Sequence, residues 1–262
     1  MSSAIFGIAK NEFSRCIGHP LVIGLTIFLC ILALIVVSGN YMSIQKSQQE
    51  PIDSNVLFLD ITSSSIYWIS SILSFLSLSI GVVSMAGERS SGSIRVLLSK
   101  PVYRMEIIMG KFIGINSLIL LLILFVISIC IALSLIAFGL PSAFPEDILR
   151  VLSLAFLLFL LCAIFTNIVL LCGVLFKDIY TSLILSTSLY LIWFISWPYI
   201  WTDFLKLINP VLLYLILIRD YSNTHISYLN WVSSILPYIT YMLLEILAIF
   251  LINCYIFTRE EI

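Results

Sequence analysis

An all-α polytopic membrane protein is the fold class that this sequence predicts, from its composition, its long apolar runs and its balanced charge. Hydrophobic residues make up 61% of the 262 residues, charged residues make up 10%, and the mean hydropathy is +1.15. A soluble domain carries roughly 25% charged and about 45–50% apolar residues, so this chain cannot cover a water-soluble core. Lys and Arg (13) nearly equal Asp and Glu (14), which excludes recognition of nucleic acid by a basic face.

The first predicted element is a short helix over residues 4–17, an elbow that lies flat in the cytoplasmic membrane interface ahead of the first span. Its apolar side chains recur at Ile5, Phe6, Ala9, Phe13 and Ile17. Most of the other positions carry Lys10, Asn11, Glu12, Ser14 and Arg15. This separation of apolar from charged side chains is typical of a helix on a membrane surface. The chain is expected to turn into the membrane at residues 18–20.

Six apolar runs are predicted to cross the membrane, because a bilayer-spanning helix needs about 20 mostly apolar residues. They are Pro20–Met42, Ile61–Met85, Phe112–Gly139, Ile148–Phe176, Ile179–Trp197 and Ile235–Phe257. No small-residue cleavage site follows the first run, which is therefore interpreted as an uncleaved signal anchor. All six belong to a single transmembrane domain over residues 1–262.

The run Pro210–Ile218 is apolar but too short to cross a bilayer. A longer span at this position would place Arg219 and Asp220 in the membrane, which is costly. Residues 198–234 are therefore predicted to form an outer loop that carries an interfacial or re-entrant segment.

Basic residues predict the orientation: a multi-pass protein of the cell (plasma) membrane with both termini in the cytoplasm. Nine basic residues then lie inside, namely Lys10, Arg15, Arg89, Arg95, Lys100, Arg104, Lys111, Lys177 and Arg259. Four lie outside, namely Lys46, Arg150, Lys206 and Arg219. An excess of Lys and Arg in cytoplasmic loops is the general rule for short loops.

Polar residues form a stripe along the second predicted span. Its residues follow one another at alternating spacings of four and three positions, which places them all on the same face of a helix. They are Ser63, Tyr67, Ser70, Ser74, Ser77, Gly81 and Ser84. The fifth span repeats the pattern more weakly at Ser182, Ser186 and Trp193. Two interpretations stay open. Small polar residues let helices pack closely, or these faces line a partly hydrated pathway or a dimer seam, because polar surface facing lipid is unfavourable.

Glu245 is the only acidic residue deep within a predicted span, where an ionised acid costs roughly 2.5–3.5 kcal/mol. Tyr238 and Tyr241 precede it on the same helix face, and Asn167 of the fourth span is a third candidate hydrogen-bond donor. Glu245 is either a packed, protonated structural residue or a group that takes part in substrate passage or gating.

The residue types needed for metal or nucleophilic chemistry are not grouped in this sequence. None of the six cysteines has a CxxC or Cys/His ligand spacing, and the two histidines, His19 and His225, lie far apart. A metal site, a disulfide framework and a catalytic triad are therefore not expected. An intramembrane enzyme is equally disfavoured, because the chain lacks both a GxSG serine paired with a membrane histidine and a pair of membrane aspartates.

The cytoplasmic segment between the second and third spans, residues 86–111, carries the clearest functional pattern. Ser90 or Ser91 is expected to cap a short helix that runs to Ser99, and Pro101 would end it. The apolar residues of this helix form a patch two turns long: Ile94, Leu97 and Leu98. Such a helix suits docking into a groove of a soluble partner, although the pattern also fits a helix that lies on lipid headgroups.

The order of residues in this segment resembles the corresponding loop of ABC transporter permeases of the type-2 export family. The matching stretch runs from Glu88 to Arg104, reads ERSSGSIRVLLSKPVYR, and is closed by Gly110-Lys111 before the next span. The N-terminal helix, the six spans and the segment Ile208–Tyr214 with Arg219 extend the resemblance over nearly the whole chain.

This resemblance implies the permease subunit of an ATP-driven exporter that works with a separate ABC ATPase subunit. The chain has no G-x-x-x-x-G-K-[ST] motif, so ATP and Mg²⁺ are expected on the partner and no cofactor on this chain. Assembly of two permeases with two ATPases implies a homodimer or pairing with a second permease. The compact form is similar to the branch linked to copper-enzyme maturation and small-molecule export.

The implied ATPase contact comprises the loop, whose central part would be the coupling helix, and nearby cytoplasmic positions. Its residues are Glu88, Arg89, Gly92, Ser93, Ile94, Arg95, Leu97, Leu98, Pro101 and Arg104, with Glu12, Arg15, Lys177 and Asp178. The alternative function is an ion-gradient-driven secondary carrier, which rests on Glu245 alone. An ATPase gene beside this one would favour the ABC interpretation.

Overall fold

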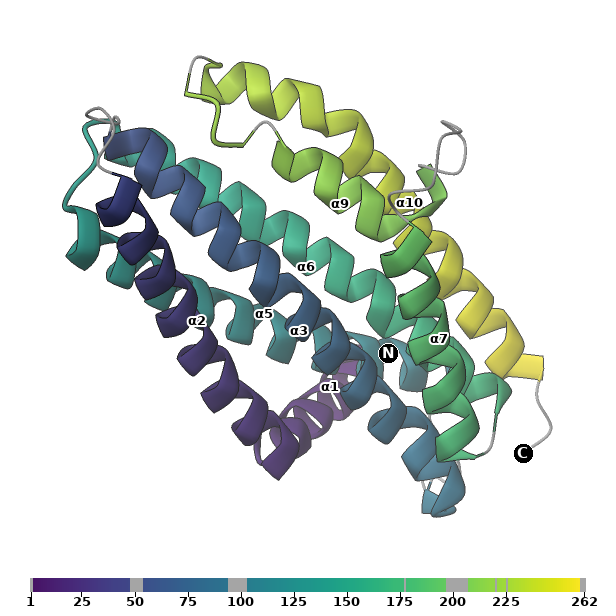
Figure 1. The fold of residues 1–262 in the computed structure, drawn as a ribbon. Coiled ribbons are helices and arrows are strands. Elements are labelled where there is room, and N and C mark those ends of the chain that lie inside the picture. Colours follow the sequence, from purple (N-terminus) through teal and green to yellow (C-terminus); the bar gives the residue numbers. More distant parts are fainter. Residues whose placement is uncertain are drawn as a thin grey trace.

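The computed structural model describes residues 2–47, 54–93, 103–176, 178–196, 207–219, 221–224 and 226–259. Every regular element within these ranges is a helix, so the predicted all-α class is confirmed. Helix α1 (Ser2–Ile17) lies across one end of the bundle and meets α2 (Pro20–Ser47) at a sharp corner (Figure 1). This end of the bundle is called the α1 end below.

Six helices of the described residues are long and apolar enough to cross a membrane, which confirms the predicted number of spans. They are α2, α3 (Ser54–Ser90), α5 (Arg104–Phe138), α6 (Phe144–Leu175), α7 (Ile179–Ser196) and α10 (Tyr228–Arg259). A shorter helix, α9 (Pro210–Arg219), stands where the apolar segment too short to span is predicted. The chain is therefore a multi-pass membrane protein.

Helices α2, α3, α5, α6 and α10 each extend beyond one or both of the bounds predicted from hydropathy. The predicted spans stop short of charged residues, but Glu88 and Lys111 form a buried ion pair that neutralises both, so α3 and α5 continue past these positions. The predicted loop over residues 86–111 is consequently shorter, and only residues 91–103 lie between the two helices.

Helices α6 and α3 form the centre of the bundle, and they pack more closely on each other than on any other helix. The most apolar stretch of α6 is 83% buried and that of α3 is 72% buried, whereas the values for α7 and α10 are 17% and 11%. Apolar side chains such as Ile184 and Leu244 therefore point outward. In a membrane these outer faces meet lipid or another subunit.

Candidate functional site

A lysine without solvent exposure lies at the α1 end of the bundle. Lys111 on α5 is 0% exposed, and its Nζ lies 2.5 Å from Glu12 Oε1 and 2.8 Å from Glu88 Oε2. The same Nζ donates to the Ser84 carbonyl oxygen at 2.9 Å and to Ser84 Oγ at 3.2 Å. Helices α1, α3 and α5 thus meet at one ammonium group.

Arg15 completes a four-charge cluster, which we define as Glu12, Arg15, Glu88 and Lys111. Its guanidinium donates to Glu12 Oε2 at 2.8 Å and also to Glu88 Oε1. The two carboxylates are buried, and the Arg15 side chain is 38% exposed. Two positive and two negative charges leave no net charge in the cluster. Because an unpaired buried charge is strongly destabilising, each member requires its partners.

Two glycines on α5 permit α1 to approach closely enough for these ion pairs. A Cβ added at Gly110 would lie 2.7 Å from Ile8 Cβ, and one added at Gly114 would lie 2.7 Å from the Ala9 carbonyl oxygen. The Gly-x-x-x-Gly spacing is a packing signal, but its partner is the short helix α1 rather than another span. The two glycines flank Lys111 on either side, which is the signal that could have located the cluster from sequence.

Arg89 joins the end of α3 to the end of α6. Its guanidinium donates to the Gly173 carbonyl oxygen at 3.2 Å and to the Val174 carbonyl oxygen. These carbonyls belong to the last turn of α6, where a cation is favourably placed.

Asp178 caps the start of α7. Its carboxylate accepts hydrogen bonds from the Thr181 N–H at 3.1 Å and from Thr181 Oγ1 at 2.9 Å. The bond from the Thr181 backbone holds the pKa of Asp178 below its ordinary value.

Arg104 anchors the other side of the loop. Its guanidinium donates to the Phe257 carbonyl oxygen of α10 at 3.4 Å. Tyr103 N–H donates to Glu106 Oε2 at 3.1 Å, which closes the first turn of α5. With Arg89 and the four-charge cluster, both described ends of the loop are therefore attached to neighbouring helices.

The described part of the loop ends with Gly92 and Ser93. Gly92 has φ of +74°, a left-handed conformation that commonly follows a helix end. Ser90 is the last residue of α3 and donates to the Gly87 carbonyl oxygen at 3.1 Å, so of the two caps predicted for a following helix only Ser91 remains. The remaining predicted contact residues lie outside the described ranges: Ile94, Arg95, Leu97, Leu98, Pro101 and Lys177.

The serine stripe of α3 is covered by other helices of the same chain. Ser70, Ser74 and Ser77 are 5%, 1% and 0% exposed, and α3 packs on α6 and α7. A Cβ added at Gly81, on the same stripe, would lie only 1.9 Å from Val169 Cγ1 of α6. This placement supports close helix packing, and the pathway or dimer seam stays a prediction.

The weaker stripe on α7 also faces inward. Ser182 and Ser186 are both 0% exposed, and the Trp193 ring packs against Phe165 of α6 with 6.0 Å between centroids. Tyr190 of the same helix donates to the Ser71 carbonyl oxygen of α3 at 3.4 Å. The two polar stripes therefore contribute to one interface among α3, α6 and α7.

Glu245 on α10 is half-buried and lacks the hydrogen bonds predicted for it. Among the described residues its Oε2 is buried without a hydrogen-bond partner. Tyr241 points outward at 42% exposure, and Asn167 donates to the Ile246 carbonyl oxygen at 3.2 Å instead. The expectation that these side chains donate to Glu245 is therefore not met, because the backbone of α10 takes the Asn167 amide.

A second buried cation lies at the end of the bundle opposite α1. Arg150 of α6 is 1% exposed and donates to the carbonyl oxygens of Tyr221 and Asn223, each at 3.1 Å, and to that of Ile226. It also contacts Glu146 Oε1 at 3.2 Å. We call this arrangement the Arg150 clamp, because it holds the connection between α9 and α10. From the sequence, Arg150 is predicted only to be one of the basic residues outside the membrane.

The residues at the α1 end pair charges and pack three helices against one another. Across the described ranges, no group of three or more His, Cys, Asp or Glu side chains could hold a metal ion. Cys16 lies beside the cluster, where burial raises the pKa of its thiol to about 11, so the thiol is protonated at neutral pH and is a poor nucleophile. What the arrangement provides is an ion-pair connection among α1, α3 and α5.

Comparison with known proteins gives one family. The model of the family described as ABC-2 family transporter protein matches residues 6–262. Comparison with the curated proteins finds no match.

Proposed function

The chain belongs to the ABC-2 family of transporter proteins, and from this premise we propose that it is the permease subunit of an ATP-driven exporter. The loop between α3 and α5 would receive the conformational signal of a separate ABC ATPase subunit. Two ATPases that carry ATP and Mg²⁺ would serve two permeases, most simply two copies of this chain. The α1 end would face the cytoplasm of a cell whose plasma membrane holds the complex.

The observation that carries this proposal is the sharing of Lys111 between Glu12 and Glu88. Glu88 stands at the end of the helix that enters the loop, and Lys111 lies in the helix that leaves it. Glu12 belongs to α1. One buried ammonium group therefore connects both arms of the loop with the N-terminal helix.

Burial makes this connection stiff. Ion pairs that are shielded from water are screened far less than exposed pairs, and separating their members would leave buried charges unpaired. A push on the loop would therefore displace α1, α3 and α5 together. Arg89 and Arg104 extend the same displacement to α6 and α10 through their bonds to helix-end carbonyls.

The apolar patch of the loop is the proposed anchor for the ATPase. Leu97→Asp should place a charge in an apolar contact and weaken association by about 2–4 kcal/mol. The experiment is co-purification of the tagged permease with its cognate ATPase, with ATP hydrolysis as the second readout. Lys100→Asp is the control, because it adds an aspartate to the same loop without removing an apolar side chain. It separates the effect of the added charge from the effect of losing the apolar anchor.

The expected result is that the permease alone hydrolyses no ATP, that the wild-type complex does, and that Leu97→Asp alone loses the ATPase. Hydrolysis by the isolated chain would contradict the proposal. Unchanged co-purification of the Leu97→Asp variant would instead favour a loop helix that lies on lipid headgroups.

A secondary carrier is the alternative, and the unpartnered buried Oε2 of Glu245 is the observation in its favour. A carboxyl group with one buried oxygen that accepts no hydrogen bond could take up and release a proton during transport. In vesicles without the ATPase, cargo movement driven by a pH gradient and lost in Glu245→Gln would establish this alternative. The exporter proposal expects no such movement, and it expects Glu245→Gln to assemble with the ATPase and transport cargo at nearly the wild-type rate.

A further inference from the structure

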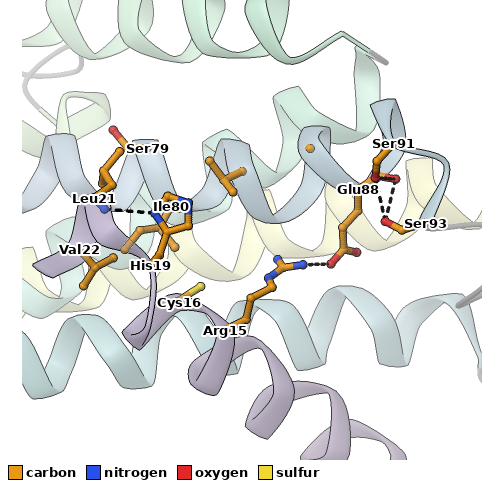
Figure 2. Close-up of a pocket in the computed structure, with 12 residues that line it drawn as sticks. Arg15, Cys16, His19, Leu21, Val22, Ser79, Ile80, Glu88, Ser91 and Ser93 are labelled. Carbon is orange, nitrogen blue, oxygen red and sulfur yellow. Dashed lines mark hydrogen bonds and ion pairs between the residues drawn. The ribbon is translucent and has the colours of Figure 1, made fainter.

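A pocket of about 270 Å³ lies between the corner of α1 and α2 and the adjoining part of α3 (Figure 2). One end of the pocket is polar, and the other is lined by Leu21, Val22, Ile80 and Val83. A cavity with charged groups in one part of its wall and aliphatic side chains in another fits an amphiphile better than it fits an ion or a sugar.

The polar end carries one charge of each sign. Arg15 points from α1 to Glu88 on α3, and the two side chains form an ion pair in the pocket wall (Figure 2). The Arg15 side chain is 38% exposed and that of Glu88 is 11% exposed, so the guanidinium remains accessible from the pocket. Ser91 and Ser93 add hydroxyl groups that lie 3.0 Å apart.

His19 adds a directed donor at the corner between the two helices. Its Nδ1 accepts a hydrogen bond from the Leu21 N–H at 3.3 Å. A neutral imidazole that accepts at Nδ1 carries its proton at Nε2. The ring therefore offers an N–H donor in the part of the pocket wall formed with Leu21 and Val22, apart from the guanidinium of Arg15 (Figure 2).

The apolar end continues onto the outer surface of the bundle. Leu21 and Val83 line the pocket and are 38% and 42% exposed. Beyond Leu21, the outward face of α2 continues with Ile23 and Ile27, which are more than half exposed. An apolar span begins at this corner, so the polar end lies near the level of lipid headgroups and the apolar end beside the acyl chains.

We propose that this pocket binds a phospholipid with a zwitterionic, amine-bearing headgroup from the leaflet on the α1 side. The phosphate would lie at Arg15, the amine would point to Glu88, His19 would donate to an ester carbonyl where the acyl chains begin, and one acyl chain would follow Leu21 and Val83 out to the bilayer. The paired charges of the wall complement a headgroup that carries both signs, whereas a purely anionic headgroup would meet the Glu88 carboxylate. The proposal does not depend on the ATPase partner.

The test uses the full chain reconstituted in vesicles of equal parts phosphatidylethanolamine and phosphatidylglycerol, then extracted and analysed by native mass spectrometry. The wild-type chain should retain phosphatidylethanolamine in excess. Val83→Trp fills the apolar end, and His19→Ala removes the Nε2 donor; each should lower retention roughly fivefold, as expected for the loss of one modest interaction. Leu21→Trp is a second filling variant should Val83→Trp fold poorly.

Ile113→Trp is the matched control. Ile113 is 44% exposed on α5, close to the level of Lys111, and it does not line the pocket. This variant should retain phosphatidylethanolamine as the wild type does. Equal retention in all variants, an equal loss in Ile113→Trp, or an excess of phosphatidylglycerol would each overturn the proposal.

Discussion

Lys111 and Arg150 are both buried cations, at opposite ends of one bundle, but their partners differ in kind. Lys111 is held by two carboxylates from two other helices, and a second cation, Arg15, shares both of them. Arg150 is held mainly by three backbone carbonyls of one short connection. The first arrangement joins α1, α3 and α5, whereas the second holds one connection against one helix.

This difference separates two uses of a buried charge. Carbonyl oxygens match the fixed fork of a guanidinium, so the Arg150 clamp sets one loop conformation. Carboxylates shared by two cations balance charge across three helices, and the loss of one member leaves the others uncompensated. The α1 end is therefore expected to respond as a unit, and the opposite end to respond locally.

The largest effect is expected for Lys111→Met, which leaves two buried carboxylates with Arg15 alone. Removal of one partner from a buried ion pair costs about 3–5 kcal/mol. Thermal unfolding of the purified chain measures the loss. Adding Glu12→Gln restores charge balance between Arg15 and Glu88 and should recover a large part of it. Equal stability of Lys111→Met and the wild type would mean that the cluster does not hold α1.

Arg150→Met should have a smaller and more local effect. It leaves three loop carbonyls without their donor, but Asn223 is exposed and Ile226 only half-buried, so water can replace the guanidinium there and the total loss should be about 2–3 kcal/mol. Hydrogen exchange should increase between α9 and α10, while the α1 end and the association with the ATPase stay unchanged. An equal increase at α1 would erase the distinction between the two ends. Arg150→Lys is the companion variant, and it should recover only part of the protection because one ammonium cannot replace the guanidinium fork.

Gly114→Ala should have the smallest effect of the three. Its Cβ would lie 2.7 Å from the Ala9 carbonyl oxygen and 2.8 Å from Glu12 Cβ, so the backbone of α1 has to shift, at about 1–2 kcal/mol, within the usual range for overpacking. Gly24→Ala is the control, since nothing lies within 4 Å of its added Cβ. It should be neutral or slightly stabilising in a helix. The melting temperatures of the two variants make the comparison, and equal values would contradict close packing at Gly114.

The long apolar runs were enough to predict the fold, but they could not locate the buried charges. Hydropathy indicates which stretches cross a membrane, and all six were found. It treats every charge as a span boundary, and for that reason α3 and α5 were predicted too short. The partners of Lys111 lie far from it in sequence, in Glu12 and Glu88, and the Gly110 and Gly114 spacing beside Lys111 indicates a close helix contact without identifying these partners.

The serine stripe of α3 shows a second limit of prediction from sequence. Its periodicity correctly places Ser70, Ser74 and Ser77 on one face, but periodicity alone does not say what covers that face. Residues of α6, α7 and α9 lie against Ser70 and Ser74 in this chain. Glu245 illustrates the converse, because shared helix spacing with Tyr238 and Tyr241 did not produce a hydrogen bond.

The central claim is that the four-charge cluster makes α1 and the arms of the loop move as one body. Spin labels at Lys10 on α1 and Ser90 at the end of α3, both exposed, report the distance between these helices by pulsed electron resonance. In the complex with its ATPase, a narrow distance distribution should persist unchanged when ATP binds, and Lys111→Met should broaden it. A wild-type distance that changes on ATP binding, or a distribution that Lys111→Met leaves narrow, would contradict the claim.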